Sequence, residues 1–284
     1  MHDQADELRE LVRRAALENS WVSTAVPRLI VVSGGKGGVG TTTVAVNLAV
    51  ALAAQGHRTV LVDANLNRGG VVRLCPVKEQ DTIAAVLAGR RTVHEVLQPG
   101  PFGLHVLPGL SSFDPSPEVS PAAQERLLQQ LRGLGQHAEI MILDVGSGLT
   151  QEVRRFWAAA DLVFLVTTPE PDAILDAYAA IKVLPSSETP VPVRTLVNQS
   201  TDEENATKVH ERLAEVSQRF LGREIFAAGN IPFDLQVKDA ARAAQPVLMT
   251  APNCPASIGF MQLTDNTIQA LEAVPAAFTP RQVA

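Results

Sequence analysis

The sequence alternates between short apolar runs and longer segments of helical periodicity. The apolar runs are continuous rather than alternating with polar residues, which is typical of parallel strands covered by helices on both faces. This alternation predicts an α/β fold, a single-domain, doubly wound, mostly parallel sheet flanked by helices. The expected strands are 29–32, 58–63, 104–109, 140–144, 162–168 and 193–199.

Helices are expected between these strands, and a further helix precedes the first one. The expected helices are 3–18, 44–53, 82–87, 92–97, 121–134, a segment that begins at 169–172, 202–220 and 257–271. Helix 3–18 has one apolar face and is separated from the first strand by residues 19–27, so it is either a docked amphipathic helix or an appendage with its own function. We therefore divide the chain into an N-terminal helix with its linker, a main domain and a tail, at residues 1–27, 28–272 and 273–284.

The amino-acid composition is that of a soluble globular protein and gives no indication of a nucleic-acid-binding or membrane-spanning protein. The 284 residues are 46% hydrophobic and 19% charged, as in a soluble globular protein with a sizeable core, and the net charge of −6 gives no reason to expect nucleic-acid binding. The two cysteines lie far apart, no apolar run spans a bilayer, and the polar N-terminus is not a secretory signal, so we expect a cytoplasmic protein. From Ile258 onward Arg281 is the single basic residue, so we expect no direct membrane anchor.

A glycine-rich stretch, Ser33 to Thr43, joins the first strand to a helix and reads SGGKGGVGTTT. Strand, glycine loop and helix form the context of a phosphate-binding P-loop, whose backbone N–H groups and helix N-terminus attract an anion. Thr42 falls where such a loop places its Mg2+ ligand, whereas Thr41 occupies the usual lysine position. The residues expected to hold the nucleotide phosphates are Gly35, Lys36, Gly37, Gly38, Val39, Gly40, Thr41, Thr42 and Thr43.

Two further strands end in acidic residues, Asp63 and Asp144, and Asn65 follows the first of them. The carboxyl ends of parallel strands face the ligand, so these residues are expected near the P-loop. Asp144 is the expected Mg2+ partner, with a helix cap as the alternative. Asn65 is either part of the site or a polar turn residue.

The segment Gly35 to Gly40 resembles the deviant Walker A motif, K-G-G-V-G-K-[ST], of the MinD/ParA family of nucleotide-switched ATPases. The resemblance implies that the cofactors are ATP and Mg2+ and that the protein forms a homodimer when ATP is bound. In that family the early lysine reaches the partner's nucleotide across the dimer, which implies the same role for Lys36.

Other segments resemble the same family. Asp63 to Leu66 is similar to the D-x-D-L of its switch I, where Asn65 replaces the aspartate that orients the attacking water. Asn198 matches the asparagine that binds adenine, with Gln199 in place of a base, and Pro232 matches a loop that lines the adenine pocket. The resemblance thus implies a degenerate catalytic set of Lys36, Asp63 and Asn65. It implies metal ligands at Thr42, Asp63 and Asp144.

Within the family, two segments resemble the FlhG branch of flagellar-number regulators, also called FleN or YlxH. Residues 167–178 match its T-T-P-E-P text, and residues 3–9 match its N-terminal D-Q-A-x-x-L-R motif. That motif stimulates a GTPase of the FlhF type, which implies an FlhF-like partner for this chain and recruitment to a cell pole or flagellar site. The implied contact residues are Asp3, Gln4, Ala5, Leu8 and Arg9.

Two readings of the chemistry follow. Thr41 removes a positive charge from the phosphates, and Asn65 is a poorer proton acceptor than aspartate. We therefore expect an FlhG-like regulator with weak or absent ATP hydrolysis. The alternative is an active but slow MinD/ParA-type ATPase that positions another cargo, in pilus assembly, division-site placement or chromosome partition.

Overall fold

The computed structural model describes residues 26–66, 69–78, 81–110, 119–135, 137–184 and 191–273. The expected helix at 3–18, its motif residues Asp3 to Arg9, and almost all of the tail lie outside the described residues. The boundaries that we set between the N-terminal segment, the main domain and the tail therefore stay predictions.

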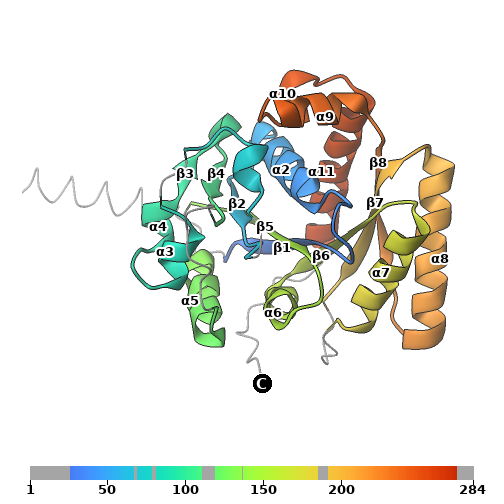
Figure 1. Cartoon of the computed structure of the whole chain (residues 1–284), viewed down its shortest axis with the longest axis horizontal. Coiled ribbons are helices and arrows are strands. Elements are labelled where there is room, and N and C mark those ends of the chain that lie inside the picture. The colour runs from blue at the N-terminus through green and yellow to red at the C-terminus, as the bar shows by residue number, and fades with distance from the viewer. Residues whose placement is uncertain are drawn as a thin grey trace, which may run out of the picture.

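One eight-stranded sheet runs through the molecule in the order β3-β4-β2-β5-β1-β6-β7-β8, and every neighbouring pair is parallel except β3 and β4. This sheet, with helices on both faces, confirms the predicted fold class (Figure 1). The strands are β1 (Arg28–Gly34), β2 (Thr59–Asp63), β3 (Gln98–Pro99), β4 (His105–Leu107), β5 (Ile140–Ser147), β6 (Leu162–Thr167), β7 (Val193–Ser200) and β8 (Phe226–Pro232).

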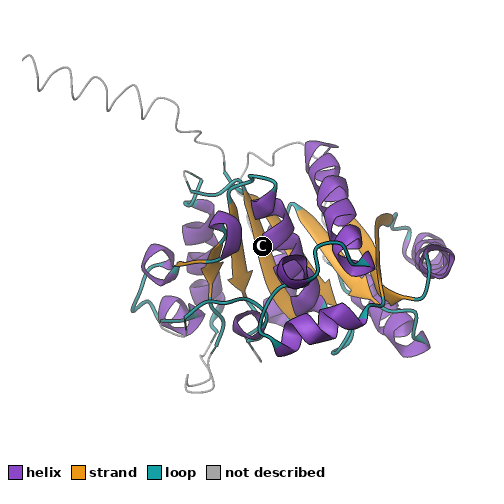
Figure 2. Cartoon of the chain, turned by 90° about the horizontal axis from the view of Figure 1, so that it is seen from above, coloured by secondary structure: helices purple, strands orange, loops and turns teal. Residues whose placement is uncertain are grey.

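The helices form two layers, one on each face of the sheet, as the views in Figures 1 and 2 show. One layer contains α2 (Thr41–Ala54), α9 (Leu235–Arg242), α10 (Val247–Thr250) and α11 (Pro255–Ala273). The other contains α3 (Ile83–Leu87), α4 (Val93–Val96), α5 (Pro121–Arg132), α6 (Gln151–Ala159), α7 (Pro171–Lys182) and α8 (Glu203–Leu221). No helix in the described ranges has the length and apolarity needed to cross a bilayer.

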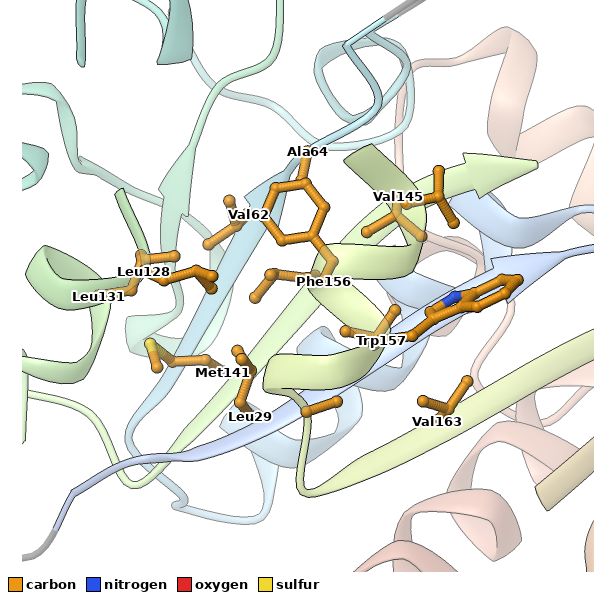
Figure 3. Close-up of a cluster of buried hydrophobic side chains, with 14 of the residues drawn as sticks. Leu29, Val62, Ala64, Leu128, Leu131, Met141, Val145, Phe156, Trp157 and Val163 are labelled. Atoms are coloured by element: carbon orange, nitrogen blue, oxygen red, sulfur yellow. The ribbon is translucent and has the colours of Figure 1, made fainter. Parts of the chain in front are cut away.

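Successive residues of the central strand β1 serve the two layers in turn. Leu29 and Val31 pack into one hydrophobic cluster, and Ile30 and Val32 into the other, because side chains alternate along a strand. Trp157 of α6 lies in the first cluster and is 1% exposed (Figure 3). Burial on both faces explains why the strands are continuously apolar.

The carboxyl end of the central strands differs from the prediction at β5. We expected this strand to end at Asp144, but it continues to Ser147, which pairs with Gly34 of β1. The pairing shifts register between Val32 and Gly34, so the strand continues past its apolar run. As a result, the last residues of β5 lie beside the start of the glycine loop.

Candidate nucleotide-binding site

The glycine loop lies between the end of β1 and the first residue of α2. Gly38 and Gly40 have φ angles of 88° and 92°, a left-handed conformation that favours glycine. Gly40 is the N-cap of α2, no side chain caps this end of the helix, and its first turn contains no acidic residue. The first backbone N–H groups of α2 are therefore suited to bind an anion.

Two neighbouring elements press against the loop and fix its path. A Cβ atom on Gly35 would lie 2.3 Å from the backbone of Asp176 in α7, so only glycine fits there. On the other side, Nδ2 of Asn198 in β7 donates a hydrogen bond of 2.8 Å to the carbonyl oxygen of Val39. Asn198, expected to bind adenine, is 5% exposed and ties β7 to the loop in this structure.

The two positions that decide the charge of the loop are Lys36 and Thr41. Lys36 Nζ lies 3.8 Å from Oδ2 of Asp172, at the start of α7, in an ion pair that is largely exposed to solvent. Thr41 is 8% exposed, and its methyl group lies close to Gly34, where a Cβ atom would be 2.9 Å away. The usual lysine position is thus filled by a small side chain that packs into the fold.

Asp63 and Asp144 occupy paired positions on β2 and β5 and are both fully buried. Asp63 accepts hydrogen bonds from the backbone N–H groups of Gly70 (2.7 Å), Val71 (3.0 Å) and Asn65 (3.3 Å). Burial raises the pKa of Asp63 to about 6, against the opposing effect of these three donors. Asp63 therefore anchors the backbone at Asn65, Gly70 and Val71 to the end of β2.

Asp144 has a free oxygen. Its Oδ1 accepts a hydrogen bond of 3.0 Å from the N–H of Gly146, while its buried Oδ2 has no hydrogen-bond partner among the described residues. Burial and then the charge of Asp63 raise the pKa of Asp144 to about 7, against the opposing effect of the nearby Thr42 hydroxyl and of the Gly146 N–H.

The carboxylates of Asp144 and Asp63 and the hydroxyl of Thr42 fit a hard divalent cation such as Mg2+, because oxygen atoms of these groups are its preferred ligands. Thr42 and Asp144 would hold the ion, with the Asp63 carboxylate beside them. Within the described ranges no group of three or more His, Cys, Asp or Glu side chains could hold a metal ion. A cation here would complete its coordination with water or phosphate oxygens, and beside a bound nucleotide it would neutralise charge on the phosphates.

Asn65 lies against the strand β5. A Cβ atom on Gly146 would lie 2.4 Å from Nδ2 of Asn65, so the Asn65 amide packs against the backbone of β5 just after Asp144. Gly146 has a φ of 68°, and glycine is needed there for both reasons. The amide is thus placed beside the acidic pair.

Sequence reasoning missed three site residues that depend on the tertiary fold. Asp172, at the start of α7, pairs with Lys36. Gly109 lies against Asp63, where a Cβ atom would be 2.4 Å from the carboxyl carbon. Ser147 faces Gly37 of the loop. For Gly109 the sequence did contain a signal, the Pro108-Gly109 pair after β4, because a glycine in this position often marks a close approach of the backbone to another group.

The adenine-binding residues that the resemblance implies lie at one edge of the site. Ile231, the neighbour of Pro232 in β8, is the register partner of Asn198, and Pro232 itself pairs with Ser200. The Asp63–Asp144 pair lies on β2 and β5, at the other side of β1. The P-loop thus lies between an acidic pair and an amide-rich edge.

Comparison with known proteins supports this reading. A sequence model of the AAA domain matches residues 27–191. The antiactivator FleN of Pseudomonas aeruginosa is 33% identical over 254 residues, which is 89% of each chain. The chain belongs to the MinD/ParA family of P-loop ATPases.

Two further relatives extend the comparison. The flagellum site-determining protein YlxH of Helicobacter pylori is 26% identical, over 89% of this chain and 86% of YlxH. The septum site-determining protein MinD of Pyrococcus horikoshii, solved in complex with Mg-ADP, has a TM-score of 0.72. That comparison covers 85% of this chain and 96% of the other at 21% identity, so it supports the fold.

Proposed function

We propose that this protein is a FleN-like regulator of flagellar number or placement that is controlled by nucleotide. It binds Mg-ATP, dimerises when ATP is bound, and hydrolyses ATP slowly or not at all. The observation that carries the proposal is the 33% identity to the antiactivator FleN along 89% of both chains. The similarity to a flagellum site-determining protein, YlxH, supports the same cellular role.

The geometry around the glycine loop supports nucleotide binding. The uncapped start of α2 attracts phosphate, and the free Oδ2 of Asp144 beside Thr42 suits the Mg2+ that accompanies it. The related MinD of Pyrococcus horikoshii carries Mg-ADP, which supports the same ligand class for this chain.

Slow hydrolysis is proposed from two positions. Thr41 offers a methyl and a hydroxyl where a lysine would neutralise phosphate charge, and Asn65 offers an amide where a carboxylate would orient water. Phosphoryl transfer depends on these electrostatic contributions, so the loss of both leaves a protein that holds ATP for long periods.

The N-terminal segment is proposed to act on an FlhF-type GTPase. The support is the D-Q-A-x-x-L-R text at residues 3–9, which this chain shares with the FlhG branch. Deletion of residues 1–20 should abolish stimulation of the cognate GTPase and leave the melting temperature unchanged. Unaltered stimulation, or a large fall in melting temperature, would favour a helix that is only docked on the domain.

The nucleotide part is tested by calorimetry with ATP and ADP in Mg2+, combined with light scattering to measure the dimer. We expect binding of both nucleotides and dimerisation with ATP alone. A gene deletion then tests the cellular role, since the number or placement of flagella should change. Normal flagella with defective division, pili or chromosome partition would favour the alternative of a MinD/ParA-type ATPase for another cargo.

A further inference from the structure

The helices α5 and α6 lie in contact with each other on one face of the sheet (Figure 1). Their apolar side chains point into the core, where Leu128 and Leu131 of α5 share a cluster with Phe156 and Trp157 of α6 (Figure 3). The remaining surface of the two helices carries four arginines, none of them buried, which we call the arginine face. These residues are Arg126, Arg132, Arg154 and Arg155.

The arginine face is positively charged on a protein that is negative overall. The two helices contain four arginines, no lysine and two acidic residues, Glu125 and Glu152, whereas the whole chain has a net charge of −6. Glu152 lies close enough to Arg155 for the arginine to help lower the pKa of Glu152, after the larger effect of the Thr150 hydroxyl. Two glutamates still leave this surface with an excess of positive charge.

No carboxylate of the described residues forms an ion pair with any of these four arginines. Other arginines do form such pairs, for example Arg58 with Glu139 at 3.1 Å and Arg91 with Asp81 at 3.1 Å. The charge of the arginine face is therefore not neutralised within the part of the chain that the structure describes.

The arginines are held in place by hydrogen bonds that use few of their donors. Three of them donate to a backbone carbonyl oxygen, and the pairs are Arg126 with Leu87 (3.3 Å), Arg132 with Ala159 (3.5 Å) and Arg154 with Leu149 (3.1 Å). Arg155 donates to Oε1 of Gln124 on the neighbouring helix at 3.5 Å. A guanidinium has five N–H groups, so each arginine keeps most of its donors for another group. Because its side chain is already positioned, it loses less freedom when it binds.

We propose that the arginine face binds an acidic segment of a partner protein, whose Asp and Glu carboxylates accept hydrogen bonds from the guanidinium groups. A planar guanidinium donates two parallel hydrogen bonds to one carboxylate, which adds geometric specificity to the charge attraction. Arginine is also among the residues that contribute most to the binding energy of protein–protein interfaces.

Other anionic partners fit this surface less well. Among the described residues, no large exposed apolar side chain lies on α5 or α6, so the face has no group to insert into an anionic membrane. For the same reason it has no exposed aromatic ring on which a nucleic-acid base could stack. The net charge of −6 opposes nucleic acid more strongly than an acidic protein segment, because the phosphate backbone has a much higher charge density.

The test uses a fluorescently labelled oligoglutamate peptide, titrated without nucleotide and followed by anisotropy. Arg154→Gln combined with Arg155→Gln should weaken binding about tenfold or more, since a hydrogen bond to a charged group contributes about that factor. Arg126→Gln, on the other helix, should also weaken it. Lysine at positions 154 and 155 keeps the charge but removes the planar fork, so binding should fall by a smaller factor.

Arg212→Gln is the matched control, because Arg212 is an exposed arginine on α8, and it should bind the peptide like the wild type. Hydrogen exchange should show that the peptide protects α5 and α6, and melting temperatures show that each variant is folded. Full binding by the lysine variant would overturn the paired geometry.

The proposal as a whole is overturned if the glutamine variants bind the peptide as well as Arg212→Gln does, or if wild type does not bind it. Tighter binding of a DNA duplex or of phosphatidylglycerol vesicles than of oligoglutamate would assign the face to nucleic acid or membrane instead. Because no nucleotide is present, each of these outcomes is separate from the proposed function.

Discussion

Asp63 and Asp144 lie opposite each other on neighbouring strands, with both carboxylates fully buried. Asp63 is held by the backbone N–H groups of Asn65, Gly70 and Val71, but Oδ2 of Asp144 has no hydrogen-bond partner in the described part of the chain. Two buried like charges destabilise each other when both are ionised. The fold therefore stores an electrostatic cost that a bound cation would relieve.

This relationship predicts how stability changes with pH in EDTA, without nucleotide. The pKa values of Asp63 and Asp144 are raised from 3.8 to about 6 and about 7, so the folded state binds more protons than the unfolded state. The contribution of the pair to stability is therefore greatest below about pH 4 and is lost as the pH rises to about 7.

The difference between wild type and Asp144→Asn isolates that contribution in thermal unfolding from pH 5 to pH 8. The variant should gain stability relative to wild type as the pH rises, with a melting temperature several degrees higher at pH 8. Asp239→Asn, at an exposed surface carboxylate, should follow the wild-type curve. Parallel curves for wild type and Asp144→Asn would contradict the electrostatic account.

The same carboxylate should couple Mg2+ to nucleotide. Asp144→Asn should weaken Mg-ATP binding about tenfold or more, because loss of an outer metal partner typically has that effect, and should change binding of ATP in EDTA much less. Calorimetry with and without Mg2+ measures both values, with Asp239→Asn as the control. An equal loss under the two conditions would show that Asp144 acts on the fold of the site and not on the metal.

Lys36 and Asp172 form an exposed ion pair within one chain. If Lys36 serves the partner's nucleotide, this pair competes with the dimer, so Asp172→Asn should increase the fraction of dimer in ATP. Exposed pairs contribute little to stability, so the melting temperature should hardly change. Lys36→Ala should abolish the dimer. Light scattering across a protein dilution series measures this, and a weaker dimer in Asp172→Asn would contradict the competition.

The sequence was sufficient for features that are encoded locally. Continuous apolar runs marked the buried strands, and the glycine loop located α2, although the helix begins at Thr41 and not at the expected residue 44. The two-residue β3 was missed, since Gln98–Pro99 is too short for any periodicity. The end of β5 was misplaced because its last pairing, at Gly34, depends on a distant segment.

The candidate site divides in the same way. Thr42, Asp63 and Asp144 were predicted from local text, and the structure brings them together. The Lys36–Asp172 pair and the β-bulge that Gln199 forms in β7 could not be predicted, because each depends on how α7 and β8 pack beside the loop. Contacts between elements that are distant in sequence determine which side chains lie at the site, and local sequence does not contain that information.

Hydrolysis gives the last prediction. Thr41→Lys restores a positive charge that can neutralise phosphate charge. The longer side chain must point toward the solvent, because Gly34 and Val39 occupy the space on its buried side. Asn65→Asp restores a proton acceptor but adds a third carboxylate near Asp63 and Asp144. Alone it should gain little, since the added repulsion opposes binding of the phosphates.

The double variant should therefore hydrolyse ATP faster than either single variant by about tenfold or more, with wild type very slow. Because the two groups act on one transition state, the gain should exceed the product of the single effects. Steady-state phosphate release from the four proteins measures the cycle, with melting temperatures to show that each is folded. Brisk wild-type hydrolysis that Lys36→Ala abolishes would mean that this loop works with its single lysine, and that Thr41 and Asn65 do not limit the reaction.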